Sequence, residues 1–341
     1  MSPFKSSAGR ALGKMLEGFK SSDIGKGFGS GGGSTGPFTA TGGEKIYAPD
    51  GNTYHVFKHP GNNSDGASAP FFFEASGSPG VIEFLLVGAG GGGGWDVGGG
   101  GGGGGVVVNN PVATWTIDAG SYAVTVGQGG AGGNGPTPNE LKRGVNGGSS
   151  TLTLPTVGQI TALGGGGGGG WHPGGPSINS GGTGGANGGG HCGWNASGSG
   201  STGVQPSQNP GITGVLQYGG YQGGSNPVSS PSSGGGGGAG AGANGGTGGQ
   251  PNVGGAGGSG KTIPAFACTP STYAPALPSG SVTVIGSPGN FGPGAAGISQ
   301  DGSTPVGVGA DFTGAGGGAG GNPNQADRGG HGIVIIRYTT T

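Results

Sequence analysis

The sequence contains uninterrupted runs of glycine that constrain its fold more than any other feature. The runs cover residues 90–94, 98–105, 164–170, 234–238 and 316–318, and 102 of the 341 residues are glycine. Glycine loses more conformational freedom on folding than any other residue, and it has no side chain to bury. The runs are therefore either flexible linkers or packed segments that require the absence of side chains.

Several glycine runs follow directly after segments with the pattern of β-strands. We predict a hairpin at 44–59 around Asp50–Gly51, in which Ile46, Tyr54, Val56 and Phe57 are strand residues. Residues 81–87 are apolar enough to be buried on both faces of a sheet. Further strands are predicted within 69–77, 106–108, 113–130, 149–163, 280–287 and 331–341.

The geometry of the polyproline II helix gives the glycine runs a packed interpretation. This helix has three residues per turn, rises about 3.1 Å per residue and makes no internal hydrogen bonds. Helices of glycine alone can approach closely and hydrogen-bond to one another, which satisfies their N–H and C=O groups. We favour packing over flexible linkers because the runs border predicted strands, contain almost no serine or charge, and end in bulky residues such as Trp95 and Trp171.

Charged residues are scarce and lie mostly near the N-terminus. The net charge is −1, and residues 1–58 contain seven of the 12 Lys and Arg residues. This balance gives no indication of nucleic-acid binding. No segment has the roughly 18 consecutive apolar residues of a membrane span, and no apolar signal sequence opens the chain. We therefore expect synthesis in a cytoplasm and no membrane insertion.

Residues 1–43 form the first predicted unit, a docking segment followed by a linker. Its apolar residues at helical spacing are Leu12, Met15, Leu16 and Phe19. Gly13 and Gly18 weaken this short helix by about 1 kcal/mol each relative to alanine, so an extended anchor is the alternative. A helix that cannot bury its apolar face within itself suits docking onto a partner protein.

Aromatic and polar residues that interrupt the glycine are the candidate receptor-binding residues. They are Trp95, Asp96, Trp171, His172, His191, Trp194, Asn195, Tyr218, Tyr221 and Gln222. Rings beside amide and hydroxyl groups suit recognition of sugars or outer-membrane loops, because they combine a large contact area with orienting hydrogen bonds. The alternative is that the rings cap the glycine segments and shield backbone bonds from water. We favour the cap for any single residue and expect some of the set to be exposed.

Patterns typical of catalysis or metal binding are weak in this sequence. Gly260–Lys261–Thr262 ends like a phosphate-binding loop, but the proline-containing segment that follows cannot form the required helix. Adjacent His191 and Cys192 lack the spacer of zinc-binding pairs. Whether Cys192 pairs with Cys268 stays open. We expect no enzyme, no metal and no cofactor.

Several segments together carry a resemblance to a known family. They are YHVFKHPG (54–61), GVIEFLLVGAGGGGG (80–94), VVVNN (106–110), AGSYAVTVGQGGAGG (119–133), GGSST (147–151), QITALGGGGGG (159–169) and GGHGIVIIRYT (329–339). From residue 44 to the C-terminus the chain resembles the glycine-rich domain of bacteriophage tail-fibre and other virion fibre proteins, common in phages of marine bacteria and cyanobacteria. The resemblance implies strands joined by, or stacked beside, polyproline-II-like glycine segments. It also implies loops between these segments that contact a host receptor, as in tail-fibre-tip adhesins. Residues 1–27 do not match a known fibre attachment domain.

These observations predict a mainly β fold, in which a β-sandwich is stacked with a polyproline-II-like glycine bundle over residues 44–341. The predicted function is that of a phage virion protein, a tail-fibre or receptor-binding adhesin. Its expected partners are other virion proteins, through residues 1–43, and a host surface polysaccharide or outer-membrane protein. We expect assembly in the host cytoplasm and a final location in the virion.

Two alternatives to the adhesin stay open, and so does the oligomeric state. The chief alternative is a head-fibre or capsid decoration protein with a structural or loosely adhesive role. An ice-binding glycine-rich protein is the third class, and the irregular insertions and the basic N-terminus argue against it.

Overall fold

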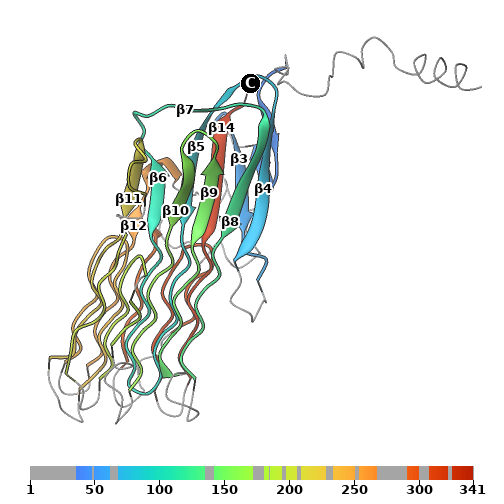
Figure 1. Cartoon of the computed structure of the whole chain (residues 1–341). Helices are drawn as coiled ribbons and strands as arrows, with labels where there is room; N and C mark the ends of the chain where they lie inside the picture. The colour runs from blue at the N-terminus through green and yellow to red at the C-terminus, as the bar shows by residue number, and fades with distance from the viewer. Residues whose placement is uncertain are drawn as a thin grey trace, which may run out of the picture.

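The structure, a computed structural model, describes most of the chain after residue 35. The described residues are 36–47, 50–61, 68–134, 142–171, 180–183, 185–193, 197–205, 209–227, 233–249, 253–266, 290–298, 307–321 and 325–340. In this part the chain is mainly β, with antiparallel sheets and a 3-10 turn at Pro264–Phe266 (Figure 1). No helix among these residues has the length and apolar character to span a membrane.

Two predicted elements fall on residues that the structure does not describe. They are the N-terminal docking helix, with Leu12, Met15, Leu16 and Phe19, and the strand predicted at 280–287. Both stay predictions.

The first sheet has five antiparallel strands in the order β1-β4-β8-β9-β10. Their bounds are β1 (Thr39–Thr41), β4 (Ala69–Ser76), β8 (Gly120–Val126), β9 (Ser150–Leu154) and β10 (Gly158–Ala162). β1 pairs with β4 through Thr39 and Ser76, and Phe38 beside it is buried. The folded unit therefore includes residues 36–43, which lie before the boundary predicted at residue 44.

The second sheet has the order β11-β6-β5-β14-β3-β2, with β7 paired to β5. Their bounds are β2 (Glu44–Tyr47), β3 (Asn52–Lys58), β5 (Gly80–Val87), β6 (Val106–Asn109), β7 (Trp115–Ile117), β11 (Val215–Tyr218) and β14 (Ile333–Thr339). The predicted hairpin is confirmed, since β2 pairs with β3 and Gly51 takes φ +79° in the turn, a region that favours glycine. A small third sheet pairs β12 (Lys261–Thr262) with β13 (Asn290–Phe291).

Apolar side chains cover both faces of the second sheet. Phe84 and Leu86 of β5 pack with residues of the first sheet in one core, and Leu85 and Val87 pack in a second core on the opposite face. The four side chains are fully buried. This alternation confirms that β5 is buried on both faces over residues 84–87, whereas Val81 at its start is 52% exposed.

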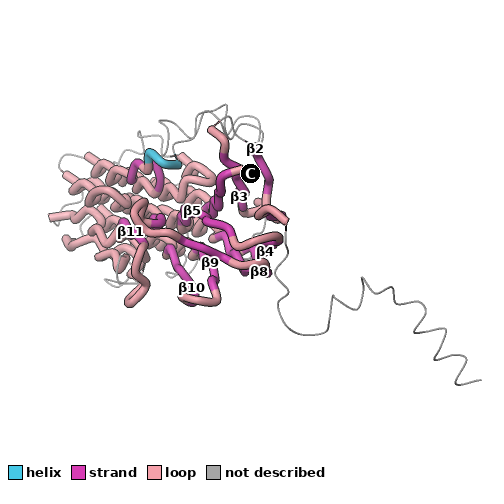
Figure 2. The backbone as a smooth tube through the Cα atoms, turned by 90° about the horizontal axis from the view of Figure 1, so that it is seen from above, coloured by secondary structure: helices cyan, strands magenta, loops and turns pink. Residues whose placement is uncertain are grey.

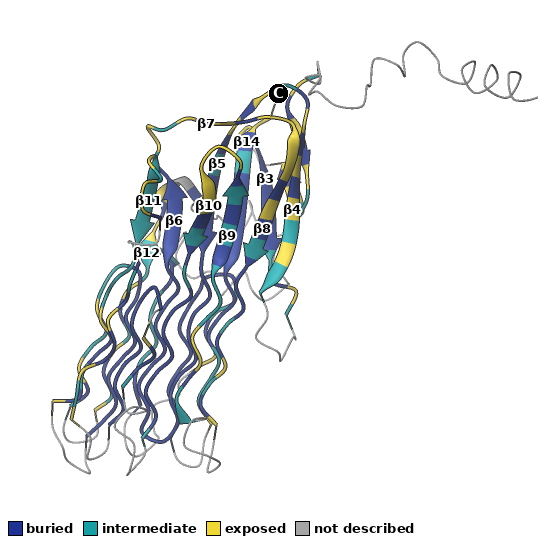
Figure 3. Cartoon of the chain, in the orientation of Figure 1, coloured by how far each residue is buried: buried dark blue, intermediate teal, exposed yellow. Residues whose placement is uncertain are grey.

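The strands continue as glycine-rich segments that extend side by side away from the sheets (Figure 1). β5, β8 and β10 lead into such segments, and others lead back into β6, β9 and β14. Viewed from above, the segments form an ordered stack beside the strands (Figure 2). Most of the central ones are buried (Figure 3).

Candidate functional site

The glycine-rich segments form a body that we call the glycine layer. It comprises the described residues within 88–105, 127–134, 142–149, 163–171, 180–193, 197–203, 221–227, 233–249, 253–260, 292–298, 307–321 and 325–332. Every predicted receptor-binding residue that the structure describes lies in this layer or at its border with the second sheet. The backbone hydrogen bonds between the segments of the layer therefore fix the positions of those residues.

Residues 98–105 lie at the centre of the layer and donate all of their N–H groups to other segments, over 2.7–3.4 Å. Every third residue donates to the same neighbour. The sets are Gly99, Gly102 and Gly105 to segment 163–169, Gly98, Gly101 and Gly104 to segment 314–320, and Gly100 and Gly103 to segment 236–239. The carbonyl groups accept from three further segments, 88–94, 187–193 and 295–298. Within the described residues, this run thus bonds to six neighbours and leaves no backbone group unpaired.

The absence of a side chain is a packing requirement along these segments. A Cβ atom built on Gly167 would overlap the carbonyl oxygen of Gly144, and one on Gly101 would overlap that of Gly91. The obstacle is backbone rather than a flexible side chain, so it cannot move aside cheaply. Glycine is needed here because neighbouring backbones approach to hydrogen-bonding distance.

The turn at residues 95–97 joins segments 88–94 and 98–105 at the end of the layer that lies away from the sheets. Asp96 and Val97 have φ of 60° and 53°, a region that is uncommon for residues with side chains. Trp95 and Asp96 are only 4% and 9% exposed. Lys142 Nζ lies 4.8 Å from the centroid of the Trp95 ring, and the half-buried Trp171 donates its backbone N–H to the Trp95 carbonyl over 3.2 Å. Trp95 therefore covers the end of the layer.

His191 and Cys192 are buried inside the layer. His191 Nδ1 lies 2.7 Å from the carbonyl oxygen of Cys192, and burial lowers the pKa of the imidazole. Burial also raises the pKa of the Cys192 thiol, with a smaller contribution from the charge of Asp96. Within the part of the chain that the structure describes, no three His, Cys, Asp or Glu residues group to hold a metal.

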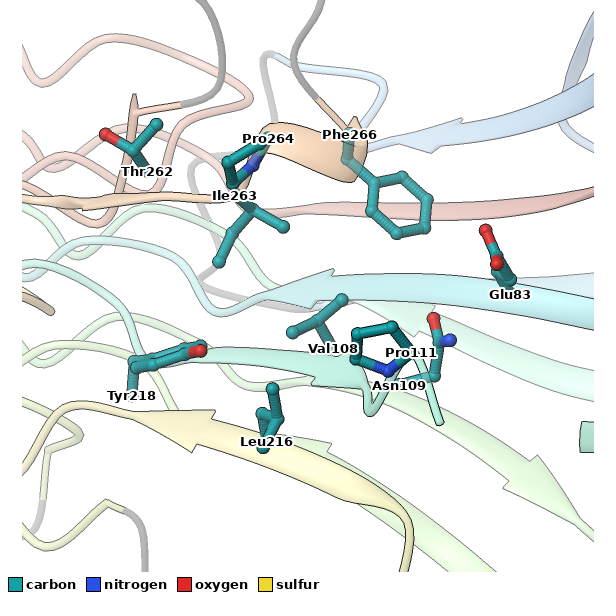
Figure 4. Close-up of a pocket in the computed structure, with 10 residues that line it drawn as sticks. All are labelled: Glu83, Val108, Asn109, Pro111, Leu216, Tyr218, Thr262, Ile263, Pro264 and Phe266. Atoms are coloured by element: carbon teal, nitrogen blue, oxygen red, sulfur yellow. The ribbon is translucent and has the colours of Figure 1, made fainter. Parts of the chain in front are cut away.

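Tyr218 lines an apolar pocket of about 180 Å³ on one face of the second sheet. The pocket is formed by Glu83, Val108, Asn109, Pro111, Leu216, Tyr218, Thr262, Ile263, Pro264 and Phe266. Leu216 and Tyr218 face Ile263 and Phe266 across it (Figure 4). Lys261 Nζ lies 4.4 Å from the Tyr218 ring centroid, and Arg337 lies 4.8 Å from that of Phe266 while pairing with Glu83. Both rings are therefore already engaged by cations.

Gln222 lines a second hollow of about 220 Å³, which we call the polar groove. Its walls are Ser199, Gln222, Gly223, Gly224, Ser225, Asn244, Gly245 and Thr247. Neighbouring Tyr221 is half-buried, and its carbonyl accepts hydrogen bonds from the N–H groups of Gly188 and Gly203 over 2.9 and 3.0 Å. Unlike the pocket at Tyr218, the polar groove presents hydroxyl and amide groups.

A titratable cluster that the sequence analysis did not predict joins the glycine layer to β14. His331 Nδ1 accepts the N–H of Gly129 over 3.1 Å, and its ring stacks on His59 at 4.5 Å between centroids. Burial lowers the pKa of His331 to about 4. Burial alone would raise the pKa of Asp311, but its paired hydrogen bonds from Arg328, at 2.7 and 2.8 Å, lower it overall.

Asn187 is a second residue that the sequence analysis missed. Its side chain is fully buried, and Nδ2 donates to the carbonyl oxygens of Gly103 and Gly104 over 2.8 and 3.3 Å. The available signal was a lone amide residue inside a run of small residues, GGANGGG. It supplies donors to carbonyls that backbone neighbours do not reach.

The structure does not bring the predicted receptor-binding residues that it describes together in one site. Trp95, Asp96 and His191 are buried, Trp171 lies at the end of the layer, Tyr218 lines the apolar pocket, and Tyr221 and Gln222 lie at the polar groove. His172, Trp194 and Asn195 fall outside the described residues. Of those described, only Gln222 has a largely exposed side chain.

The comparison with known families matches the layer and most of both sheets. A family model described as a glycine-rich domain matches residues 64–339. The chain therefore belongs to this glycine-rich domain family. A search of curated proteins finds no match.

Proposed function

We propose that the glycine segments are polyglycine II helices, the glycine form of the polyproline II helix, and that they pack into a rigid bundle. The support is the hydrogen-bond pattern of residues 98–105, in which the neighbour repeats every third residue and six segments surround one. None of these eight glycines is among those with positive φ. With a rise of about 3.1 Å per residue, such a segment extends about 25 Å.

We further propose that this bundle carries the adhesive residues of a phage virion protein, a tail-fibre or receptor-binding component that contacts the host surface. The observation that carries the proposal is that the interior of the layer is held by its own backbone. Side chains at segment ends and on the flanks are then free to differ without loss of the core, as in scaffolds that present binding loops. The ligand classes are a host polysaccharide or an outer-membrane protein.

Binding of the purified full chain to bacterial cells tests this function. Fluorescently labelled protein is incubated with intact cells, with purified lipopolysaccharide and with outer-membrane vesicles. We expect saturable binding to cells of a host strain and to one of the two purified fractions. Absence of saturable binding to every strain that the phage infects would contradict the adhesive role.

The burial of Trp95, Asp96 and His191 favours a second candidate function, a purely structural head-fibre or decoration protein. In that role Trp95 caps the end of the bundle, Asp96 and His191 pack within it, and no receptor is needed. Immunogold labelling of virions separates the two, because label at the distal end of a tail supports adhesion and label on the capsid supports decoration.

Residues 1–43 supply the proposed contact with other virion proteins. We propose that Leu12, Met15, Leu16 and Phe19 form the docking face. Deleting residues 1–35 removes this face and leaves β1 intact. The truncated chain is expected to fold but to be missing from assembled particles, as measured by immunoblotting of purified virions.

A further inference from the structure

The polar groove lies on a flank of the glycine layer, where outward-facing side chains recur every third residue. Gln222 and Ser225 lie on one segment and Asn244 and Thr247 on its neighbour, and Ser199 comes from a third. Gln222, Asn244, Thr247 and Ser199 are exposed and Ser225 is half-exposed. The hollow of about 220 Å³ is thus walled by hydroxyl and amide groups.

Hydrogen bonds fix which atoms of the two amides remain for a ligand. Asn244 Oδ1 accepts the backbone N–H of Gln222 over 2.9 Å, so the NH₂ group of Asn244 is its unused donor. Gln222 Nε2 donates to the carbonyl of Gly200 over 3.3 Å, which leaves Oε1 as acceptor. The hydroxyls of Ser225 and Thr247 lie 3.3 Å apart and can each donate or accept. The groove therefore offers both donors and acceptors to a ligand.

Backbone bonds hold the groove walls in place before any ligand arrives. Gly245 donates to the carbonyl of Gln222 over 3.0 Å, and Gly248 donates to that of Ser225 over 2.9 Å. On the other side, Gln222 bridges to Thr202. A ligand that fits these walls pays little to order them, which favours affinity.

The groove is also free of charge in its own side chains and in the sequence around them. Residues 144–260 contain no Asp, Glu, Lys or Arg, and they supply all of the groove's walls. Carboxylate, phosphate and sulfate groups are usually recognised by Arg or Lys, which are missing here. A neutral ligand with many hydroxyl groups matches both the hydrogen-bonding groups and the absence of charge.

We propose that the polar groove binds a neutral polysaccharide, a chain of hexose units without carboxylate, phosphate, sulfate or amino groups. The inference rests on the proposed adhesive function and names the ligand class for the part of the candidate site that contains Gln222. It places this contact on the flank of the layer rather than at the turn of residues 95–97.

A glycan array with the full chain tests the inference. The array carries neutral glucans, mannans and galactans beside uronic-acid and sulfated polysaccharides. Thr247→Val removes one hydroxyl at constant shape, and Asn244→Asp removes the NH₂ donor while keeping the acceptor for Gln222. Thr41→Val, at an exposed position on β1 of the first sheet, is the matched control.

We expect the wild type to bind one or more neutral polysaccharides and not the charged ones. Each groove variant should bind about 3- to 10-fold more weakly, as expected for one lost hydrogen bond, and the control should be unchanged. Circular dichroism verifies that all three variants are folded.

Preference of the wild type for charged glycans, or equal binding by the groove variants and the wild type, would overturn the inference. Absence of glycan binding by the wild type would also overturn it, including the case where the chain instead inhibits ice growth. The function and the inference fail separately. Cell binding without array binding overturns the neutral-glycan groove alone, whereas array binding without cell binding supports the groove and contradicts the adhesive role.

Discussion

Substitution of Gly167 tests whether the close backbone contacts within the layer stabilise the fold. A Cβ at this position overlaps the Gly144 carbonyl, so the two segments must separate. Three hydrogen bonds hold these segments and their neighbours together at this point. The N–H of Gly144 donates to the carbonyl of Gly168 over 2.9 Å, and the N–H of Gly168 donates to the carbonyl of Gly92 over 2.8 Å. The N–H of Gly167 donates to Asn146 Oδ1 over 2.9 Å.

The magnitude follows from leaving those groups buried and unpaired. At about 1–2 kcal/mol for each bond, the loss is about 3–6 kcal/mol. Replacing glycine also reduces the freedom of the unfolded chain, which returns about 0.5–1 kcal/mol. We therefore expect Gly167→Val to lower the free energy of unfolding by about 2–5 kcal/mol, a large share of the 5–15 kcal/mol typical of a domain.

Urea unfolding and calorimetry of the variants measure this loss, with a fall in Tm of about 5–15 °C expected. Because the overlap arises at Cβ, Gly167→Ala should destabilise nearly as much as Gly167→Val. The matched control is Gly307→Val, where a Cβ would meet nothing within 4 Å. If both Gly167 variants unfold within about 0.5 kcal/mol of wild type, a range typical of neutral surface changes, the packing argument is refuted.

Three further predictions concern buried polar groups. Because the pKa of His331 is low, its neutral form stabilises the fold at pH values above about 6.5, and this contribution is lost as the pH falls towards about 4. His331→Asn keeps an acceptor for the N–H of Gly129 and should make the urea midpoint depend less on pH over that range. An unchanged pH profile of the urea midpoint would contradict this assignment. In a Cys268→Ser variant, buried Cys192 should react with a thiol reagent only at the rate of unfolding, and rapid reaction of the native protein would show the site to be open. Asn187→Ala should cost about 1–3 kcal/mol because it leaves the carbonyl of Gly103 without its side-chain donor, and urea unfolding with no measurable loss would count against that role.

The sequence predicts most of the strands because their signal is local, but it does not predict β1, β11, β12 or β13. Alternating Tyr54 and Val56 identify β3 as a strand, although residues 53–57 are buried on both of its faces. The continuous apolar run identifies β5 and reports that both of its faces are buried over residues 84–87. The exposed Val81 at the start of β5 departs from the pattern because its face of the sheet is open to solvent there, whereas Ile82 on the opposite face is fully buried in the core. Pairing across the chain is not local, and the insertion of β14 between β3 and β5 leaves no mark on either segment.

The arrangement of the glycine layer is harder to predict for a physical reason. Neighbours in the layer are chosen by the register of backbone groups, and a run of identical glycines carries no side-chain pattern that records it. The sequence therefore indicates that residues 98–105 pack but not which segments surround them. The interruption of the glycine run singles out Trp95 and Asp96 in the sequence but does not show that they are buried. Part of the cover over the Trp95 ring comes from Lys142, which is distant in sequence.

Amide hydrogen exchange over residues 88–105 tests most directly the central claim that the glycine layer is a core built from backbone. If the N–H groups of this stretch are bonded as described, peptides from it should exchange as slowly as peptides from β5 and β14, near the limit of global unfolding. Exchange of these glycines within seconds at neutral pH, while the strands stay protected, would contradict the claim and return the runs to flexible linkers.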